Sequence, residues 1–180
     1  IQASSHGLDN AALLDAIARS NGRFLGVVQI DDTVSTDELD RLHEGGVRGA
    51  RFTLIGTRRG NVEPAAFERC LERMAGRGWS VDLHIDPGHL IAHEDIIRAI
   101  PMPVVFDHIA RADVGAGHDQ PAMALLLDLL RDGNFWVKLS GADKISLDPD
   151  AAPRTGLPYG DVVPYARAVI AVAPDRVIWG

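Results

Sequence analysis

His84 and His108 are the residues whose positions most clearly suggest chemistry, because each ends an apolar, strand-like run. The two runs are Trp79–His84 and Pro103–His108. At the carboxyl edge of a parallel sheet, a neutral imidazole can bind a metal ion or move a proton near neutral pH. Two such ends on separate strands predict one shared pocket. For either histidine alone, the competing interpretation is a polar residue hydrogen-bonded at the rim of the core.

Arg51 and Lys138 place positive charge inside two other strand-like runs, Val47–Leu54 and Phe135–Leu139. A guanidinium flanked by apolar residues needs an anionic partner. For Arg51 that partner is either a structural carboxylate or the carboxylate of a substrate, and for Lys138 a structural ion pair and a catalytic role are both open. The structural candidates for Arg51 are Asp31, Asp82 and Asp107.

Strand alternation places Lys138 and Ser140 on one face of their strand. Asp107 and His108 are neighbours, so in an extended strand their side chains point to opposite faces. We therefore do not expect Asp107 to orient His108. On the loop after the strand that carries Arg51, Arg58 is a further candidate for binding a substrate carboxylate.

Composition excludes several classes of protein. The chain has 180 residues, 46% of them hydrophobic, and a net charge of −7. These values suit a single domain that binds neither nucleic acid nor an anionic membrane. Cys70 is the only cysteine, which excludes an internal disulfide and fits a reducing compartment. No apolar run approaches the ~20 residues that span a bilayer, and nothing resembles a signal peptide, so we predict a cytoplasmic protein.

The sequence contains no glycine-rich dinucleotide or phosphate-loop motif, no G-x-S-x-G elbow and no H-E-x-x-H pair. We therefore expect no nucleotide cofactor and no serine-hydrolase chemistry.

Helix-period and strand-like segments alternate along the sequence as six helix-then-strand units. The helices are predicted at 10–21, 35–44, 64–77, 94–100, 121–131 and 159–172, and the strands at 24–30, 47–54, 79–85, 104–109, 135–139 and 176–179. This alternation predicts an α/β fold with a parallel sheet, either doubly wound or closed into a (β/α)8 TIM barrel of typically ~250 residues. Because Ile1 resembles the tail of a seventh strand and Gly180 follows the last one directly, we favour the barrel.

Six motifs occur in an order that spans nearly all of the chain. They are Gln2–Asn10, Gly46–Phe52, Gly78–His84, Val105–Arg111, Trp136–Gly141 and Pro174–Gly180. Their order resembles the amidohydrolase-related, metal-dependent hydrolases of TIM-barrel fold, a group that includes 2-pyrone-4,6-dicarboxylate lactonase. The resemblance implies that residues 1–180 are a single domain holding the second to eighth barrel strands. It places the first strand, with its His-x-His pair, before Ile1, and the eighth-strand aspartate just after Gly180.

The resemblance also implies the site. His84 and His108 would be catalytic, and would bind a divalent ion, Zn²⁺ or Mn²⁺, or contact the activated water. The implied substrate-binding residues are Arg51, Arg58, Arg111, Ser4, Ser5, His6 and Ser140. The lactonase of this group has a tyrosine where this chain has His84 and works without a required metal. That difference favours a metal-binding relative over an enzyme for the pyrone substrate.

The function implied by the resemblance is hydrolysis of a lactone, or of a related cyclic ester or amide, in a small carboxylated compound. The aspartate beyond Gly180 would act as general base on the attacking water. Two alternatives stay open: a decarboxylase or hydratase of the same fold acting on aromatic-catabolism acids, and a non-enzymatic protein that binds small acids. The sequence also leaves open whether the chain forms a homo-oligomer.

Overall fold

The computed structural model describes residues 1, 3–56, 62–148 and 158–180. A six-stranded parallel sheet lies at its centre, and the strands follow one another in chain order. The strands are β1 (Gly26–Val28), β2 (Val47–Leu54), β3 (Ser80–Ile85), β4 (Val104–Phe106), β5 (Phe135–Leu139) and β6 (Val177–Trp179). The α-helices are α1 (Ala11–Arg19), α2 (Thr36–Glu44), α3 (Pro64–Met74), α4 (Pro87–Ala92), α5 (Glu94–Arg98), α6 (Pro121–Leu129), α7 (Ala142–Ile145) and α8 (Val163–Val172). Short 3-10 helices are η1 (Ser4–His6), η2 (Asp107–Arg111) and η3 (Val114–Ala116).

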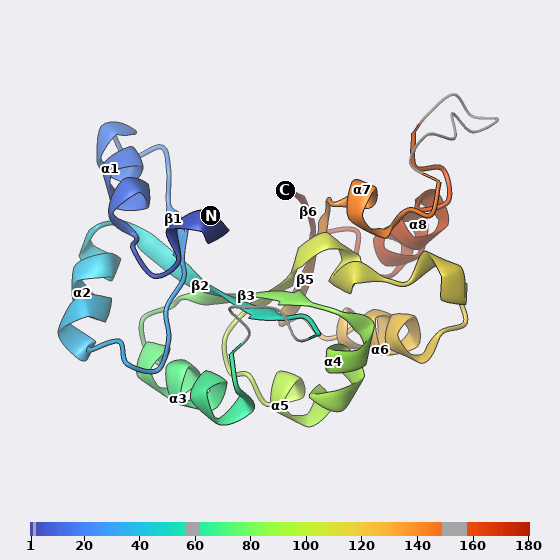
Figure 1. Cartoon of the computed structure of the whole chain (residues 1–180), viewed down its shortest axis with the longest axis horizontal. Coiled ribbons are helices and arrows are strands. Elements are labelled where there is room, and N and C mark those ends of the chain that lie inside the picture. The colour runs from blue at the N-terminus through green and yellow to red at the C-terminus, as the bar shows by residue number, and fades with distance from the viewer. Residues whose placement is uncertain (2, 57–61, 149–157) are drawn as a thin grey trace.

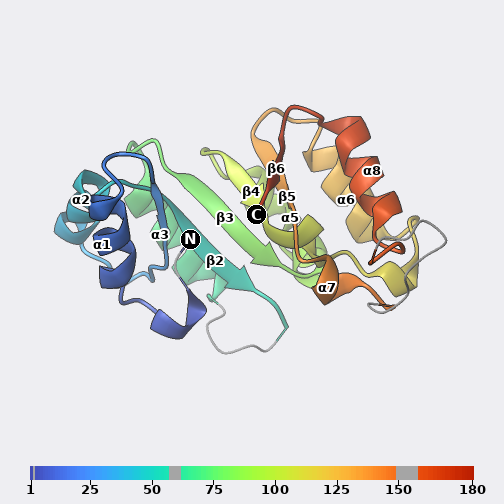
Figure 2. The same ribbon diagram turned by 90° about the horizontal axis from the view of Figure 1, so that it is seen from above.

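The sheet curls into a half-barrel with most of its helices on the convex side (Figure 1). Helices α2, α3, α5, α6 and α8 cover that outer side, and both ends of the chain lie over the concave side (Figures 1 and 2). Within the described residues, β1 and β6 are the two edges of the sheet and are not paired with each other. The concave face is therefore the open face on which a site can form.

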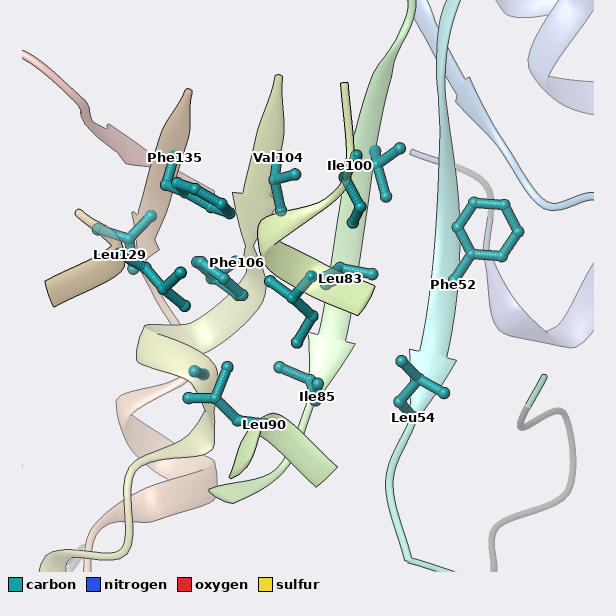
Figure 3. Packing of buried hydrophobic residues seen from close by; sticks show 14 of the residues in the cluster. Phe52, Leu54, Leu83, Ile85, Leu90, Ile100, Val104, Phe106, Leu129 and Phe135 are labelled. Carbon is teal, nitrogen blue, oxygen red and sulfur yellow. The ribbon is translucent and has the colours of Figure 1, made fainter. Parts of the chain in front are cut away.

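The two faces of the sheet differ in chemistry because side chains alternate along each strand. The side chains that face the helices are apolar and buried, and they pack against the inner faces of those helices (Figure 3). Phe106 and Phe135 stack on neighbouring strands with ring centroids 5.9 Å apart, and Phe52 meets Phe67 of α3 edge-on at 4.9 Å. The alternate positions, which face the concave side, carry the polar residues Arg51, Asp82, His84 and Lys138.

Local sequence explains where the main helices begin. Ser35 caps α2, since its hydroxyl oxygen accepts a hydrogen bond from the backbone N–H of Glu38 at 3.1 Å. Proline occupies the first turn of α3 and α6. A backbone N–H in this turn has no partner within the helix, so proline, which lacks one, fits there. No helix among the described residues is long and apolar enough to cross a membrane.

The structure confirms the α/β fold, the parallel sheet and the alternation of helices and strands, and it corrects three details. The strand predicted at 104–109 ends at Phe106, because residues 108–111 adopt positive φ angles. Helix α4 was not predicted; Asp86 caps it and Pro87 begins it. Ile1, predicted as the tail of a strand, belongs to no strand. Closure into a (β/α)8 barrel stays a prediction, since the described strands form a half-barrel.

Candidate active site

Four charged side chains form a connected network on the concave face, one from each of four neighbouring strands or strand ends. Arg51 Nε donates to Asp107 Oδ2 at 2.7 Å. Lys138 Nζ lies 2.5 Å from Asp82 Oδ2 and 2.8 Å from Asp107 Oδ1. All four side chains are at most 9% exposed. Both cations therefore have carboxylate partners within the protein, and the two positive charges balance the two negative ones.

The two carboxylates of this network differ in how firmly they hold their charge. Burial raises the pKa of Asp82, and the nearby Lys138 only partly offsets that effect. Burial also acts to raise the pKa of Asp107, but the hydrogen bond and charge of Lys138, together with Arg51, lower it overall. The ion pairs thus keep Asp107 ionised, while Asp82 is the carboxylate that takes up a proton first.

His84 and His108 meet as a perpendicular ring pair, with centroids 5.4 Å apart. His84 lies within β3 and His108 within η2, directly after β4. His108 Nδ1 and Ser140 Oγ are hydrogen-bonded at 2.8 Å, whereas His84 Nε2 is buried and has no hydrogen-bond partner among the described residues. The two histidines are therefore brought together, but the pocket that His108 lines beside Arg51 does not include His84, so one pocket shared by both stays a prediction.

Both imidazoles are held in the neutral form. Burial lowers the pKa of His84 to about 4, and the positive charge of Arg51 adds to this effect. Burial also lowers the pKa of His108, although the charge of Asp107 opposes it. Near pH 7 both rings can accept or donate a hydrogen bond or bind a metal ion.

The backbone after β4 turns left-handed and sets the direction of His108. The φ angles of His108, Ile109, Ala110 and Arg111 are +55°, +52°, +48° and +51°. Such a conformation costs energy for residues that carry a Cβ, so the surrounding structure must hold it in place. Asp107 and His108 line the same pocket, which corrects the prediction that they point to opposite faces. That prediction assumed an extended strand, and the strand has already ended.

Gly141 packs against the imidazole of His108. A Cβ at this position would lie 2.6 Å from His108 Cγ, and Gly141 has a φ of +67°. Gly141 was not predicted to be part of the site. The only signal for it was a glycine directly after Ser140, at the end of a strand.

Two pockets border Arg51. One has a volume of about 240 Å³, and its lining includes Arg51, Asp107, His108, Lys138 and Ser140. The other, of about 360 Å³, is lined by Arg51 and by residues that include Asp31, Thr53 and Glu63. A ligand in either pocket can therefore contact Arg51.

The predicted substrate-binding residues fall into three groups. Arg51 and Ser140 join His108 at the smaller pocket. Arg111 ends η2 and lies close enough for its charge to lower the pKa of both histidines, but it does not line this pocket. Ser4, Ser5 and His6 form η1, where His6 lines a separate pocket beside α1. Arg58 lies outside the described residues.

The described residues offer an incomplete set of metal ligands. They contain no group of three or more His, Cys, Asp or Glu side chains arranged to hold a metal ion. The unpartnered Nε2 of His84 and the ring of His108 fit as two imidazole ligands. A tetrahedral zinc site takes four ligands, or three and a water. This part of the chain can therefore contribute to a divalent site but does not complete one.

A family model described as amidohydrolase matches residues 1–180. The chain belongs to this amidohydrolase family. It is 38% identical over 176 residues to 4-sulfomuconolactone hydrolase of Hydrogenophaga intermedia, a match that covers 97% of this chain and 56% of that protein. It is 37% identical over 182 residues to 2-pyrone-4,6-dicarboxylate hydrolase of Comamonas testosteroni, covering 100% of this chain and 60% of that protein.

Solved structures share the fold of this chain. An apo structure from Agrobacterium tumefaciens is 30% identical with a TM-score of 0.83, and the match covers 99% of this amidohydrolase-family chain and 62% of that one. An amidohydrolase of Burkholderia multivorans, crystallised with bound zinc, shares the fold at 22% identity with a TM-score of 0.68, covering 97% and 64%. The chain spans less than two thirds of the length of each of these proteins.

Proposed function

We propose that the concave face of this half-barrel forms part of the active site of a hydrolase that opens the lactone ring of a small carboxylated compound. The observation that supports it most directly is the pocket in which a fixed arginine, a neutral histidine and a serine meet: Arg51, His108 and Ser140. The relatives named above are hydrolases of a lactone and of a pyrone dicarboxylate. We further propose that the complete protein closes its sheet into a (β/α)8 barrel around this face.

In the proposed mechanism, the terminal nitrogens of Arg51 bind a carboxylate of the substrate. The neutral rings of His84 and His108 polarise the lactone carbonyl or orient the attacking water, and Ser140 fixes the ring of His108. Addition of water breaks the ring C–O bond and yields a carboxylate and a hydroxyl group. Zn²⁺ or Mn²⁺, when bound, would supply a Lewis acid, with His84 and His108 among its ligands. The proposed partner is thus a small carboxylated substrate.

The test is ring opening by the purified protein, followed by ultraviolet absorbance, with 2-pyrone-4,6-dicarboxylate and 4-sulfomuconolactone as substrates. In an active protein, His108→Asn lowers kcat/KM by on the order of 10²- to 10⁴-fold, since it removes a group that assists proton transfer. Circular dichroism and thermal unfolding stay close to those of the parent. The control His118→Asn removes an exposed imidazole and leaves turnover unchanged.

Other outcomes would assign another function. Loss of the fold in His108→Asn makes this histidine a structural residue of the core rim. Release of CO₂ without ring opening identifies a decarboxylase, and uptake of water at a C=C bond a hydratase. Saturable binding of a dicarboxylate without turnover by the protein indicates a small-acid binding protein.

A further inference from the structure

The guanidinium of Arg51 uses only its inner nitrogen within the described part of the chain. Nε donates to Asp107 Oδ2 at 2.7 Å, and no hydrogen bond from Nη1 or Nη2 is found there. The terminal nitrogens are not among the buried side-chain atoms that lack a hydrogen-bond partner. A guanidinium has two edges that can bind a carboxylate through two hydrogen bonds, one of which includes Nε. Asp107 occupies Nε, so only the edge formed by Nη1 and Nη2 remains for a ligand.

Lys138 explains why Asp107 bonds to Nε alone and does not pair with a terminal nitrogen of Arg51 as well. Lys138 Nζ lies 2.8 Å from Asp107 Oδ1, the oxygen that Arg51 does not use. Asp82 in turn holds Lys138, because Asp82 Oδ2 accepts a hydrogen bond from Lys138 Nζ. Each oxygen of Asp107 therefore faces a different cation, and the carboxylate cannot rotate to form a two-bond pair with Arg51 without abandoning Lys138.

We propose that Asp107 is a positioning residue that fixes the Arg51 guanidinium through Nε, so that the substrate carboxylate is bound end-on by Nη1 and Nη2. This inference rests on the proposed function, because it assumes that Arg51 binds the substrate. The ligand it specifies is a planar carboxylate group. An arginine held in this way loses little side-chain freedom when it binds, and less binding energy is spent on ordering it.

Charge balance supports the same assignment. The four buried side chains sum to zero charge, so Arg51 is already tolerated without a ligand. Arg51 is then available in its bound geometry before the substrate arrives. Arg51 also lines two pockets, so a ligand in either of them can contact this side chain.

The test compares Asp107→Asn with the control Asp40→Asn. Each variant removes a carboxylate that pairs with an arginine, but Asp40 lies on α2 and pairs with Arg77, outside the charge network. For a carboxylated lactone, Asp107→Asn should raise KM by on the order of 100-fold, as expected for a misplaced binding group, with a smaller fall in kcat. Asp40→Asn should change KM by less than about threefold. The methyl ester of the same lactone should show no difference between the two variants.

A second measurement works without any activity. In protein labelled with ¹⁵N-arginine, the Nε–H resonance of Arg51, assigned with Arg51→Lys, should exchange slowly with water in the parent and in Asp40→Asn. It should exchange fast in Asp107→Asn. If Asp107→Asn does not fold, Asp107→Glu keeps the charge but moves the carboxylate by one methylene, and it should raise KM in the same way.

The possible failures can be told apart. A folded parent protein that neither opens lactones nor binds dicarboxylates sinks the proposed function, while the Nε–H signal still reports whether Asp107 holds Arg51. An active parent in which Asp107→Asn and Asp40→Asn raise KM equally overturns the positioning role alone. So does an Nε–H resonance that exchanges equally in both variants, or an Asp107→Glu variant with the KM of the parent.

Discussion

At the scale of the residue, the unpartnered nitrogen of His84 is the feature with the clearest physical consequence. Its Nε2 is buried without a hydrogen bond among the described residues, and burial together with the charge of Arg51 lowers its pKa to about 4. An imidazole in this state is neutral, and protonating it within the folded protein is unfavourable. Folding is therefore linked to pH through this side chain.

His84→Gln should flatten the dependence of the unfolding free energy on pH. The unfolded chain binds a proton near pH 6.5 and the folded protein only near pH 4, so the parent loses stability as pH falls through this window. The loss from His84 is at most about 3 kcal/mol. Urea unfolding at pH 7, 5.5 and 4 measures it. His118→Gln, which removes an exposed imidazole, should keep the slope of the parent; an equal slope in His84→Gln would contradict the argument.

At the scale of the element, the loop after β5 and the left-handed turn after β4 fix each other. Gly141 contacts the ring of His108, and Ser140 bonds its Nδ1. The same strands are tied by the charge network, which links β2, β3, the end of β4 and β5. The orientation of His108 thus depends on the neighbouring strand as much as on its own.

Gly141→Ala should lower both stability and activity, whereas Gly78→Ala should lower stability alone. Both glycines have a φ of +67°, but a Cβ at Gly78 would meet nothing within 4 Å. Each substitution costs about 1–2 kcal/mol for the left-handed backbone. Gly141→Ala costs roughly 1–3 kcal/mol more, because the new methyl group forces the His108 ring to move. Chemical denaturation and lactone turnover measure the difference, and equal losses in the two variants would show that the contact with His108 has no effect.

The sequence identified most of the site residues but not how they pair. It named Arg51, Asp82, Asp107 and Lys138, yet could not choose the partner of Arg51, since the alignment of parallel strands depends on the folded sheet. It could not predict the turn after Phe106 either. Residues 108–111 include no glycine, so nothing in them signals four successive positive φ angles. The position of His108 was predicted, but its direction was not.

At the scale of the whole molecule, periodicity was sufficient to predict the six units, because each strand and main helix has its own apolar pattern. Closure of the sheet has no local pattern, since it depends on contacts between elements far apart in the chain. Both edges of the half-barrel carry exposed apolar side chains. Phe24 and Leu25 precede β1 with 56% and 67% exposure, and Trp179 at the end of β6 is 89% exposed.

Trp179→Phe should remove most of the tryptophan fluorescence that iodide can quench. Trp79, by contrast, is 1% exposed, so Trp79→Phe should leave the quenchable fraction almost unchanged. Emission of the 180-residue chain, titrated with iodide at several protein concentrations, gives the comparison. If Trp179→Phe does not change the quenchable fraction at high protein concentration but lowers it strongly on dilution, a second copy covers this edge. A homo-oligomer, which the sequence leaves open, would then be supported.

The order of the strands in the sheet bears on how the chain folds during synthesis. Each strand from β2 onward pairs with the strand that precedes it in the chain. In the described sheet, no later strand is inserted between two earlier ones. Each helix-and-strand unit can therefore dock on its predecessor as it leaves the ribosome, with short loops to close each time. The charge network is complete only after β5 has been made, because Lys138 on that strand pairs with both Asp82 and Asp107. Until β5 has been made, two carboxylates face the concave side with only Arg51 to balance them.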